Sequence, residues 1–364
     1  DGSNPWPVSG SAGMIPPPRT RLFFPILQEL ACYKAAPVAT REEADMRVRA
    51  SLLGPKSASV TAACFTLMDC ANTAACAVTS KDATTVAAGF DDAVVRVWRL
   101  DQHPVGTPYG GPYAPPPSHV VALAGHSARV TAVAISPDMK WLISGALDGS
   151  IRLWDLALQK TVAVYKGHDF PVWSLAFAPM TSSLFASGGR DGVAYLWNTA
   201  TVVPVRMLVG HAGDVDCVVF HPNSHFVVTG SSDSTLRLWH LELAGSCTHV
   251  MSGHTAGVTA VTVSPDGRFV ASAALDWTVR VWDLDTFAVK VLLGHEHPVY
   301  SLAFSGESGA LVSGSIAGVL RVWDMVKVSG RIVTTSCLSS TFRTKSTRVL
   351  DLRFSTTNLL TVCG

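Results

Sequence analysis

The chain has 364 residues, of which 48% are hydrophobic and 15% charged, and its formal net charge is +1. This length and hydrophobic content are ample for a large buried core. The balanced charge argues against a general nucleic-acid clamp, which needs many Lys and Arg side chains to neutralise phosphates. No apolar stretch is long enough to span a membrane, and no charged segment followed by an apolar one predicts a signal peptide.

The first segment, residues 1–56, contains Pro16, Pro17 and Pro18 and no repeat signal. Its apolar pieces, such as Leu22 and Phe23, predict that it docks on the domain that follows, since a freely solvated linker would be more polar. We expect residues 1–56 to be a Pro-containing lead-in segment. Because the chain starts at Asp1 rather than Met, we also expect it to be a fragment of a longer protein.

The eight cysteines form no C-x-x-C pair and no zinc-ligand spacing. Several lie among strand-like apolar residues, where Cys acts as a small hydrophobe. We therefore expect free thiols in a reducing nuclear or cytosolic compartment. A P-loop, a dinucleotide-binding fingerprint and an H-E-x-x-H motif are also missing from the sequence, so it predicts no cofactor and no metal site. The cysteines are Cys32, Cys64, Cys70, Cys76, Cys217, Cys247, Cys337 and Cys363.

From about residue 57 the chain repeats itself. A Gly-His pair recurs every forty-odd residues, with its histidine at positions 126, 168, 211, 254 and 295, and a tryptophan follows each pair about 28 residues later. The tryptophans are Trp154, Trp197, Trp239, Trp282 and Trp323. Self-similarity at this period is typical of a WD-repeat β-propeller.

The second repeat shows the expected strands most clearly. Val130–Ile135 alternates, Trp141–Ser144 and Ile151–Trp154 follow after turns, and Thr161–Tyr165 is a weaker fourth strand. Four antiparallel strands per repeat make one blade of a propeller.

The blade count depends on both ends of the repeated region. A sixth blade precedes the five clear ones, where Val95–Trp98 ends in tryptophan but no Gly-His is present. The stretch Val349–Gly364 is a degenerate last unit without room for four strands. We expect Ala62–Leu67 to supply its outer strand, which closes the ring and removes two exposed sheet edges. The prediction is an all-β, seven-bladed propeller over residues 57–364, closed by an N-terminal strand that joins the last blade.

Two connections are unusually long, Asp101–Val120 between the first two blades and Val326–Arg343 between the sixth blade and the last. Long loops on a rigid scaffold often carry contacts. The alternative is a plain excursion of the chain into solvent.

The repeated histidines belong to a repeated set of side chains. Ser144 precedes Asp148 by four residues, Asp148 precedes Trp154 by six, and three later blades keep these offsets. A hydroxyl, an imidazole, a carboxylate and an indole N–H can link so that each buried donor finds an acceptor. We interpret this set as structural, because a Ser-His-Asp catalyst would not be repeated on separate blades beneath tryptophans. Its members are His126, Ser144, Asp148, Trp154, His168, Ser187, Asp191, Trp197, His211, Thr229, Asp233, Trp239, His254, Ser272, Asp276, Trp282, His295, Ser313 and Trp323.

Two blades depart from this set. The sixth has Ala317 where Asp is expected, and the first has Ala88 in place of the hydroxyl and no histidine. We expect these blades to be held more loosely.

Partner-binding residues are expected where the repeats differ, in the loops after Gly-His and just inside the following strand. By strand alternation, Trp173, Asp216 and Tyr300 can face the mouth of the channel, and aromatic side chains beside charge are common in interface hot spots. The alternative is that the aromatic side chains pack in the core. The predicted partner-binding residues are Phe170, Trp173, Asp214, Asp216, His297 and Tyr300.

The C-terminal region is locally basic, with only Asp351 to offset six cations. It could meet an acidic partner or a phosphate backbone; a solvated loop is the alternative, and we do not expect direct contact with DNA. The basic residues are Lys327, Arg331, Arg343, Lys345, Arg348 and Arg353.

Several segments carry a more specific resemblance. Together they resemble the WD-repeat domain of the TFIID subunit 5 family of TATA-binding-protein-associated factors, from about residue 42 to the end. The two long connections differ in content from the family pattern. The segments are Met46–Arg49, Leu53–Pro55, Ala88–Asp92, Val95–Trp98, Tyr165–Trp173, Phe220–Ser224 and Thr344–Thr347.

The resemblance implies a nuclear, non-catalytic scaffold of the RNA polymerase II initiation machinery. In that family the propeller packs against a histone-fold pair of associated factors, and TATA-binding protein is an indirect partner within TFIID. The resemblance implies no catalytic residue, cofactor, small-molecule substrate or membrane contact. Two alternatives stay open: a scaffold of a SAGA-type acetyltransferase complex, and a peptide-recognition propeller of a ubiquitin ligase or histone reader. The second alternative predicts a pocket built from Trp173, Asp216 and Tyr300.

Overall fold

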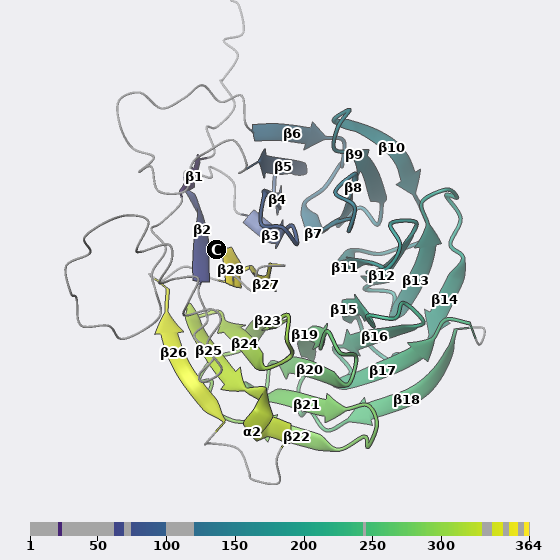
Figure 1. Ribbon diagram of the computed structural model, residues 1–364. Coiled ribbons are helices and arrows are strands. Elements are labelled where there is room, and N and C mark those ends of the chain that lie inside the picture. The colour runs from purple at the N-terminus through teal and green to yellow at the C-terminus, as the bar shows by residue number, and fades with distance from the viewer. Residues whose placement is uncertain are drawn as a thin grey trace, which may run out of the picture.

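The computed structural model describes residues 21–23, 62–68, 74–99, 120–242, 245–329, 337–344, 349–355 and 360–363. Their strands form seven four-stranded sheets arranged as a ring (Figure 1). The expected seven-bladed β-propeller is confirmed. The rest of the lead-in segment, residues 1–20 and 24–56, and the connection at residues 100–119 lie outside the described residues.

Six blades are consecutive in sequence, with the first strand of each innermost. The first and second are β3 Ala74–Thr79, β4 Thr85–Phe90, β5 Val94–Arg99 and β6 Val120–Ala124, then β7 Val130–Ile135, β8 Trp141–Ala146, β9 Ile151–Asp155 and β10 Lys160–Tyr165. The third and fourth are β11 Val172–Phe177, β12 Leu184–Gly189, β13 Val193–Asn198 and β14 Arg206–Val209, then β15 Val215–Phe220, β16 Phe226–Ser231, β17 Thr235–His240 and β18 Ser246–Ser252. The fifth and sixth are β19 Val258–Val263, β20 Phe269–Ala274, β21 Val279–Asp283 and β22 Val289–Leu292, then β23 Val299–Phe304, β24 Ala310–Ser315, β25 Val319–Asp324 and β26 Leu338–Arg343.

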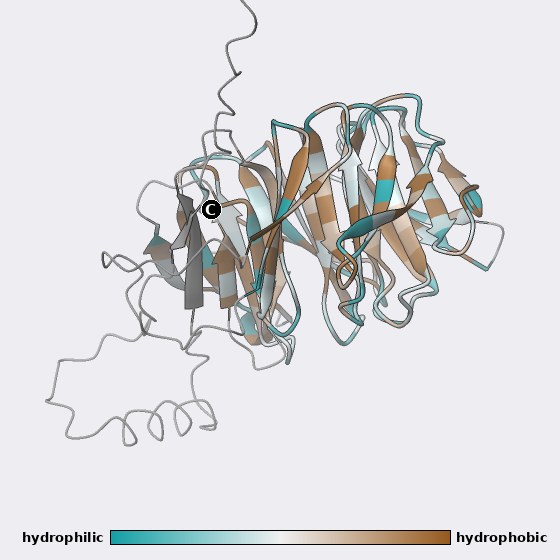
Figure 2. Ribbon diagram, turned by 90° about the horizontal axis from the view of Figure 1, so that it is seen from above, coloured by the Kyte–Doolittle hydropathy of each residue, from teal (hydrophilic) through white to brown (hydrophobic). Residues whose placement is uncertain are grey.

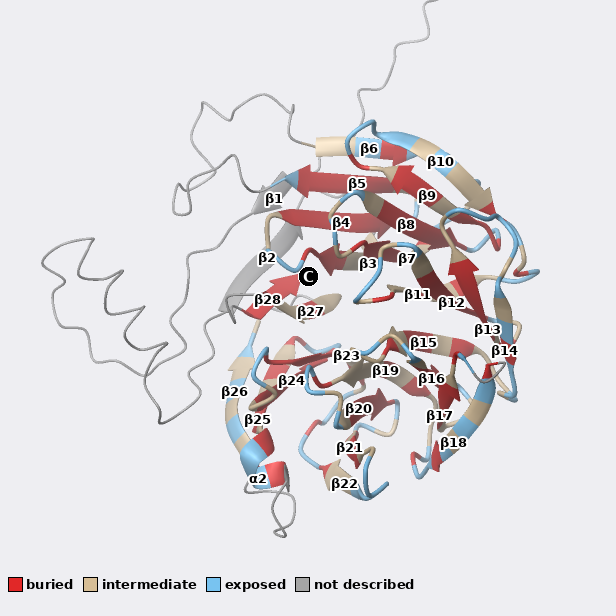
Figure 3. Ribbon diagram, turned by 45° about the vertical axis from the view of Figure 1, so that its right-hand side comes forward, coloured by how far each residue is buried: buried red, intermediate tan, exposed pale blue. Residues whose placement is uncertain are grey.

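The hydrophobic core lies between the blades. One cluster joins Ile143 and Ile151 of the second blade to Val172, Phe185 and Trp197 of the third. The second strand of each of the six consecutive blades is therefore buried along almost its whole length. Figure 2 shows hydrophobic residues gathered in the strands of the blades and hydrophilic ones in many of the loops. The fourth strands alternate between exposed and partly buried residues, and Figure 3 shows them as the exposed rim of the ring.

The last blade joins the two ends of the chain. From the inside outward it consists of β27 Asp351–Phe354, β28 Leu360–Cys363, β2 Ala62–Met68 and β1 Arg21–Phe23. β2 pairs in parallel with β28, and β1 pairs antiparallel with β2. Closure by an N-terminal strand is confirmed, but the expected outer strand is the third of the blade. The outermost strand comes from the segment interpreted as a lead-in.

The connection expected at 326–343 was wrong in part. It begins with the short helix α2, Met325–Ser329, and ends in β26, which pairs antiparallel with β25 and completes the sixth blade. The sequence of β26 hides the strand because only alternate residues pack inward, and just Leu338 and Phe342 among them are large and apolar. None of the helices in the described part of the chain is long and apolar enough to cross a membrane.

Candidate functional site

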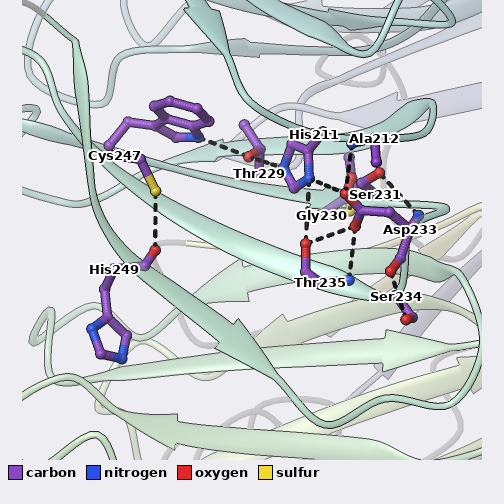
Figure 4. Close-up of polar contacts among 12 residues, drawn as sticks. His211, Ala212, Thr229, Gly230, Ser231, Asp233, Ser234, Thr235, Cys247 and His249 are labelled. Carbon is purple, nitrogen blue, oxygen red and sulfur yellow. Dashed lines mark hydrogen bonds and ion pairs between the residues drawn. The ribbon is translucent and has the colours of Figure 1, made fainter.

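The polar array repeated in the sequence assembles inside each blade. In the fourth blade, Trp239 Nε1 donates to Thr229 Oγ1 at 2.8 Å, and the same hydroxyl lies 2.7 Å from His211 Nε2. On the other side of the imidazole, His211 Nδ1 lies 2.9 Å from Asp233 Oδ2 (Figure 4). Because the hydroxyl accepts from the indole and donates its own proton to Nε2, the imidazole proton sits on Nδ1 and is donated to the carboxylate.

The third and fifth blades repeat this geometry. His168 lies 2.7 Å from Ser187 Oγ and 2.8 Å from Asp191, and His254 lies 2.8 Å from Ser272 Oγ and 2.9 Å from Asp276. The second blade differs slightly. His126 Nδ1 lies 3.1 Å from Ser150 Oγ and 3.7 Å from the Asp148 carboxylate, which itself accepts from that serine.

Burial sets the protonation of these groups. It lowers the pKa of His211 and His254, although the adjacent carboxylates oppose that shift. Burial disfavours the ionised form of Asp276, but hydrogen bonds from Thr278, His254 and two backbone amides outweigh it and lower its pKa to about 2. A neutral ring therefore donates to an ionised carboxylate. The hydroxyls of the array belong to buried residues, so no substrate can reach them as nucleophiles.

The two incomplete blades show which contacts are lost when one group of the array is missing. His295 keeps Ser313 Oγ at 2.6 Å, but Ala317 offers no carboxylate, and burial together with the Arg321 guanidinium lowers the pKa of His295 to about 4. In the first blade the buried Trp98 indole N–H has no hydrogen-bond partner among the described residues, because Ala88 has no hydroxyl to accept from it.

One member of the array was missed. Two residues after the aspartate, Ser150, Thr235 and Thr278 donate to that carboxylate through their hydroxyls at 2.6–2.7 Å. An Asp-x-Ser/Thr spacing in three repeats was a usable signal in the sequence. The third blade has Val193 at this position and keeps only the direct His–Asp contact.

A second repeated feature lies at the inner edge of the blades. The ladder between the first and second strands shifts register in each of the six consecutive blades, and the second residue of the inner strand drops out of the pairing. Such bulges re-aim a side chain. We call the bulged residues of the second to sixth blades the channel mouth: Thr131, Trp173, Asp216, Thr259 and Tyr300.

All five residues of the channel mouth line one central cavity with a volume of about 350 Å³. Thr131 donates to Val172 O and Thr259 donates to Val299 O, so each threonine ties its blade to the next. Trp173 Nε1 donates to Asp214 Oδ2 at 3.1 Å, which links the third blade to the loop entering the fourth.

The six predicted partner-binding residues are divided between two places. Trp173, Asp216 and Tyr300 meet at the cavity, and Asp214 stands directly behind Trp173. Phe170 and His297 lie in loops, exposed to solvent, and are not part of the cavity lining. Phe170 leaves 53% of its surface exposed.

The basic C-terminal residues do not act as one group within the described chain. Arg353 Nη1 donates to Thr79 O at 2.7 Å, and Asp351 accepts from Thr79 N at 3.1 Å, across the seam between the last and first blades. Lys327 lies 3.5 Å from Asp324. Arg331, Lys345 and Arg348 lie outside the described residues.

In the described part of the chain, no three His, Cys, Asp or Glu side chains are grouped closely enough to hold a metal ion. Five cysteine side chains are described, and none of them is in a disulfide bond. Burial raises the pKa of the Cys76 thiol to about 12, which makes it a poor nucleophile.

Comparison with protein families gives one match, to the family described as "WD domain, G-beta repeat". Five segments match and together cover more than half of the chain: 117–155, 159–198, 202–240, 245–283 and 287–324.

Curated relatives were compared as well. The chain is 37% identical over 113 residues to the "SAGA complex/transcription factor TFIID complex subunit Taf5" of Schizosaccharomyces pombe, a match covering 31% of this chain and 17% of the relative. It is 42% identical over 57 residues to "Transcription initiation factor TFIID subunit 5" of Encephalitozoon cuniculi, covering 16% and 10%. It is 35% identical over 85 residues to "Small ribosomal subunit protein RACK1" of Drosophila melanogaster, covering 23% and 24%. The matches thus span at most a quarter of each of these relatives. The resemblance to TFIID subunit 5 is confirmed by the first two.

Proposed function

We propose that this chain, which belongs to the WD-repeat family, is a non-catalytic interaction scaffold of a nuclear transcription complex of the TFIID type. Its propeller docks a histone-fold pair of TATA-binding-protein-associated factors during assembly of the initiation complex. TATA-binding protein is then an indirect partner. The proposal requires no cofactor, no small-molecule substrate and no direct contact with DNA.

The observation that carries this proposal is the similarity to two TFIID subunit 5 proteins from distant organisms. The polar array supports the non-catalytic part. Its hydroxyls and imidazoles are buried and bonded to one another, so the residue types that look catalytic in the sequence are used inside the blades.

The channel mouth and the loops around it are the proposed partner-binding face. Phe170 and His297 are exposed beside a cavity that carries Trp173, Asp216 and Tyr300. Tryptophan and tyrosine at a concave site flanked by charge have the composition of an interface hot spot.

A second candidate is a scaffold of a SAGA-type acetyltransferase complex. The name of the Schizosaccharomyces pombe relative includes both complexes, so similarity to it supports membership of either one.

Affinity capture of the full-length protein from nuclear extract, followed by mass spectrometry, tests the proposal. We expect TATA-binding protein together with histone-fold associated factors. An acetyltransferase module without TATA-binding protein would instead support the second candidate. Recovery of neither set would contradict both.

The same capture with Trp173→Ala tests the partner-binding face. The matched control is Phe287→Ala, which removes an exposed aromatic ring from the turn between β21 and β22, at the opposite end of the blade. We expect Trp173→Ala to reduce recovery of partners more than it lowers the melting temperature, and the control to leave recovery unchanged. A large stability loss with normal recovery would show that Trp173 is a packing residue.

A further inference from the structure

We propose that the channel mouth binds the cationic side chain of an arginine or lysine presented by a peptide, with Asp216 as its counter-ion. The inference deepens the proposed role of this face. It rests on the geometry of the cavity and does not depend on which complex contains the chain.

Asp216 carries a half-buried carboxylate. The bulge in β15 removes it from the ladder and leaves it in the cavity lining. Within the described residues, no hydrogen bond or ion pair reaches its carboxylate. A carboxylate withdrawn from water without a donor is costly, and a bound cation would supply both the charge and the hydrogen bonds.

The cavity as a whole is acidic. Its lining contains the carboxylates of Asp216 and Asp351 and, among the described residues, no Lys, Arg or His. Asp351 is already engaged by the Thr79 amide at 3.1 Å, so Asp216 is the one of the two that is open to a ligand. A negative cavity with low-dielectric walls attracts cations and repels anions.

The walls also suit a cation. The indole of Trp173 is held by Asp214 at 3.1 Å, and Tyr300 lines the same cavity two blades away from Asp216. Aromatic faces attract guanidinium and ammonium groups, most strongly where water is displaced. The cavity therefore combines charge with aromatic surface.

Electrostatics give the site a pH signature. Burial, with the nearby charges of Asp214 and Asp233, raises the pKa of Asp216 to about 7. The carboxylate is therefore ionised above pH 7 and protonated below, and cation binding should weaken as the pH falls through this range. The other titratable groups in the cavity lining are Cys76, Cys217, Tyr300 and Asp351, and the Arg353 guanidinium lies near Asp351.

The experiment is calorimetric titration of the full chain with the capped peptide Gly-Ala-Arg-Ala-Gly. The matched control replaces arginine by citrulline, which keeps the shape and removes the charge. We expect the arginine peptide to bind at least about tenfold more tightly than the citrulline peptide, and to lose most of this advantage between pH 8 and pH 6, on either side of the Asp216 pKa. Equal affinity for both peptides, or no binding of either, overturns the proposal.

The variant Asp216→Asn assigns the site. It keeps the size of the side chain and should remove the preference for arginine. Asp285→Asn, at an exposed turn of the fifth blade, should leave that preference intact. Preference for arginine that survives in Asp216→Asn overturns the assignment. The melting temperature of this variant shows separately whether it folds. It should be no lower than that of the parent chain, because the substitution removes a desolvated charge.

The proposed complex membership and the proposed cation site can fail independently of each other. Capture of TFIID subunits with no arginine preference would leave the scaffold in place and remove the cation site. A citrulline-sensitive site with no captured subunits would do the reverse.

Discussion

The polar array and the channel mouth both recur once per blade, but they behave in opposite ways. The array keeps its residue types, so the third, fourth and fifth blades have the same contacts within about 0.1 Å. The channel mouth keeps its backbone bulge and changes its side chain, from threonine to tryptophan, aspartate and tyrosine. The buried array must satisfy its own donors, whereas the channel mouth faces open space. Repetition of a residue type thus marks stability, and repetition of a backbone feature with varied side chains marks a surface free to specialise.

The largest expected effect comes from removing one of the large, fully buried tryptophans of the array. Trp239 is 2% exposed and packs against Leu208 and Val227. Trp239→Ala should destabilise the ring by about 3–5 kcal/mol, through the cavity it leaves and the loss of the hydrogen bond that the indole donates to Thr229. Urea unfolding followed by circular dichroism measures this.

The control for that loss is Trp277→Ala. Trp277 is 51% exposed at a turn with φ of 65°, so its removal should change stability by less than about 1 kcal/mol. Equal losses in the two variants, or an unchanged melting temperature for Trp239→Ala, would refute the structural role of the array.

A smaller effect should follow from completing the array in the sixth blade. Ala317→Asp places a carboxylate where the intact blades have one, beside His295 Nδ1, and should stabilise the fold by about 1 kcal/mol. The same substitution should change the pH dependence. The pKa of His295 is about 4 in the folded chain against an ordinary 6.5, so the unfolded chain binds the extra proton and stability is lost as the pH falls from 6.5 toward 4.

Ala317→Asp raises the pKa of His295 and should shrink that loss. Melting temperatures at several pH values between 4 and 7 measure it. A variant with the same acid sensitivity as the parent would show that the carboxylate does not reach the ring.

The smallest expected effect lies at the channel mouth. The folded chain holds a proton on Asp216 up to about pH 7, whereas the unfolded chain releases it near pH 3.8, so this residue costs stability as the pH rises between those values. Asp216→Asn should raise the melting temperature by about one degree at most above pH 7, because the half-exposed carboxylate is screened by water, and leave it unchanged near pH 4. A gain of the same size at both pH values would mean that charge is not the cause.

Much of the fold was predictable because the repeat is local. Each Gly-His, hydroxyl, aspartate and tryptophan lies within about 29 residues of its partners, so spacing alone identified His211, Thr229 and Trp239 as neighbours. The sequence prediction was incomplete at the end of the sixth blade and in the last blade, where the ring closes. β26 has a weak apolar pattern, β2 pairs with β28 near the other end of the chain, and β1 joins that sheet only through β2.

The candidate site was predictable only in part. The sequence identified Trp173, Asp216 and Tyr300 as variable positions, but alternation in a regular strand does not by itself aim them into a channel.

The sequence by itself determined the period, the four-stranded unit and the members of the polar array, because each depends on contacts within one blade. Only the tertiary structure decided the order of strands in the last blade, the shared cavity and the pairing of Trp173 with Asp214. Those features depend on how neighbouring blades and distant chain ends meet, and on a bulge that shifts the register by one residue. A linear pattern does not encode contacts that exist only when the ring closes.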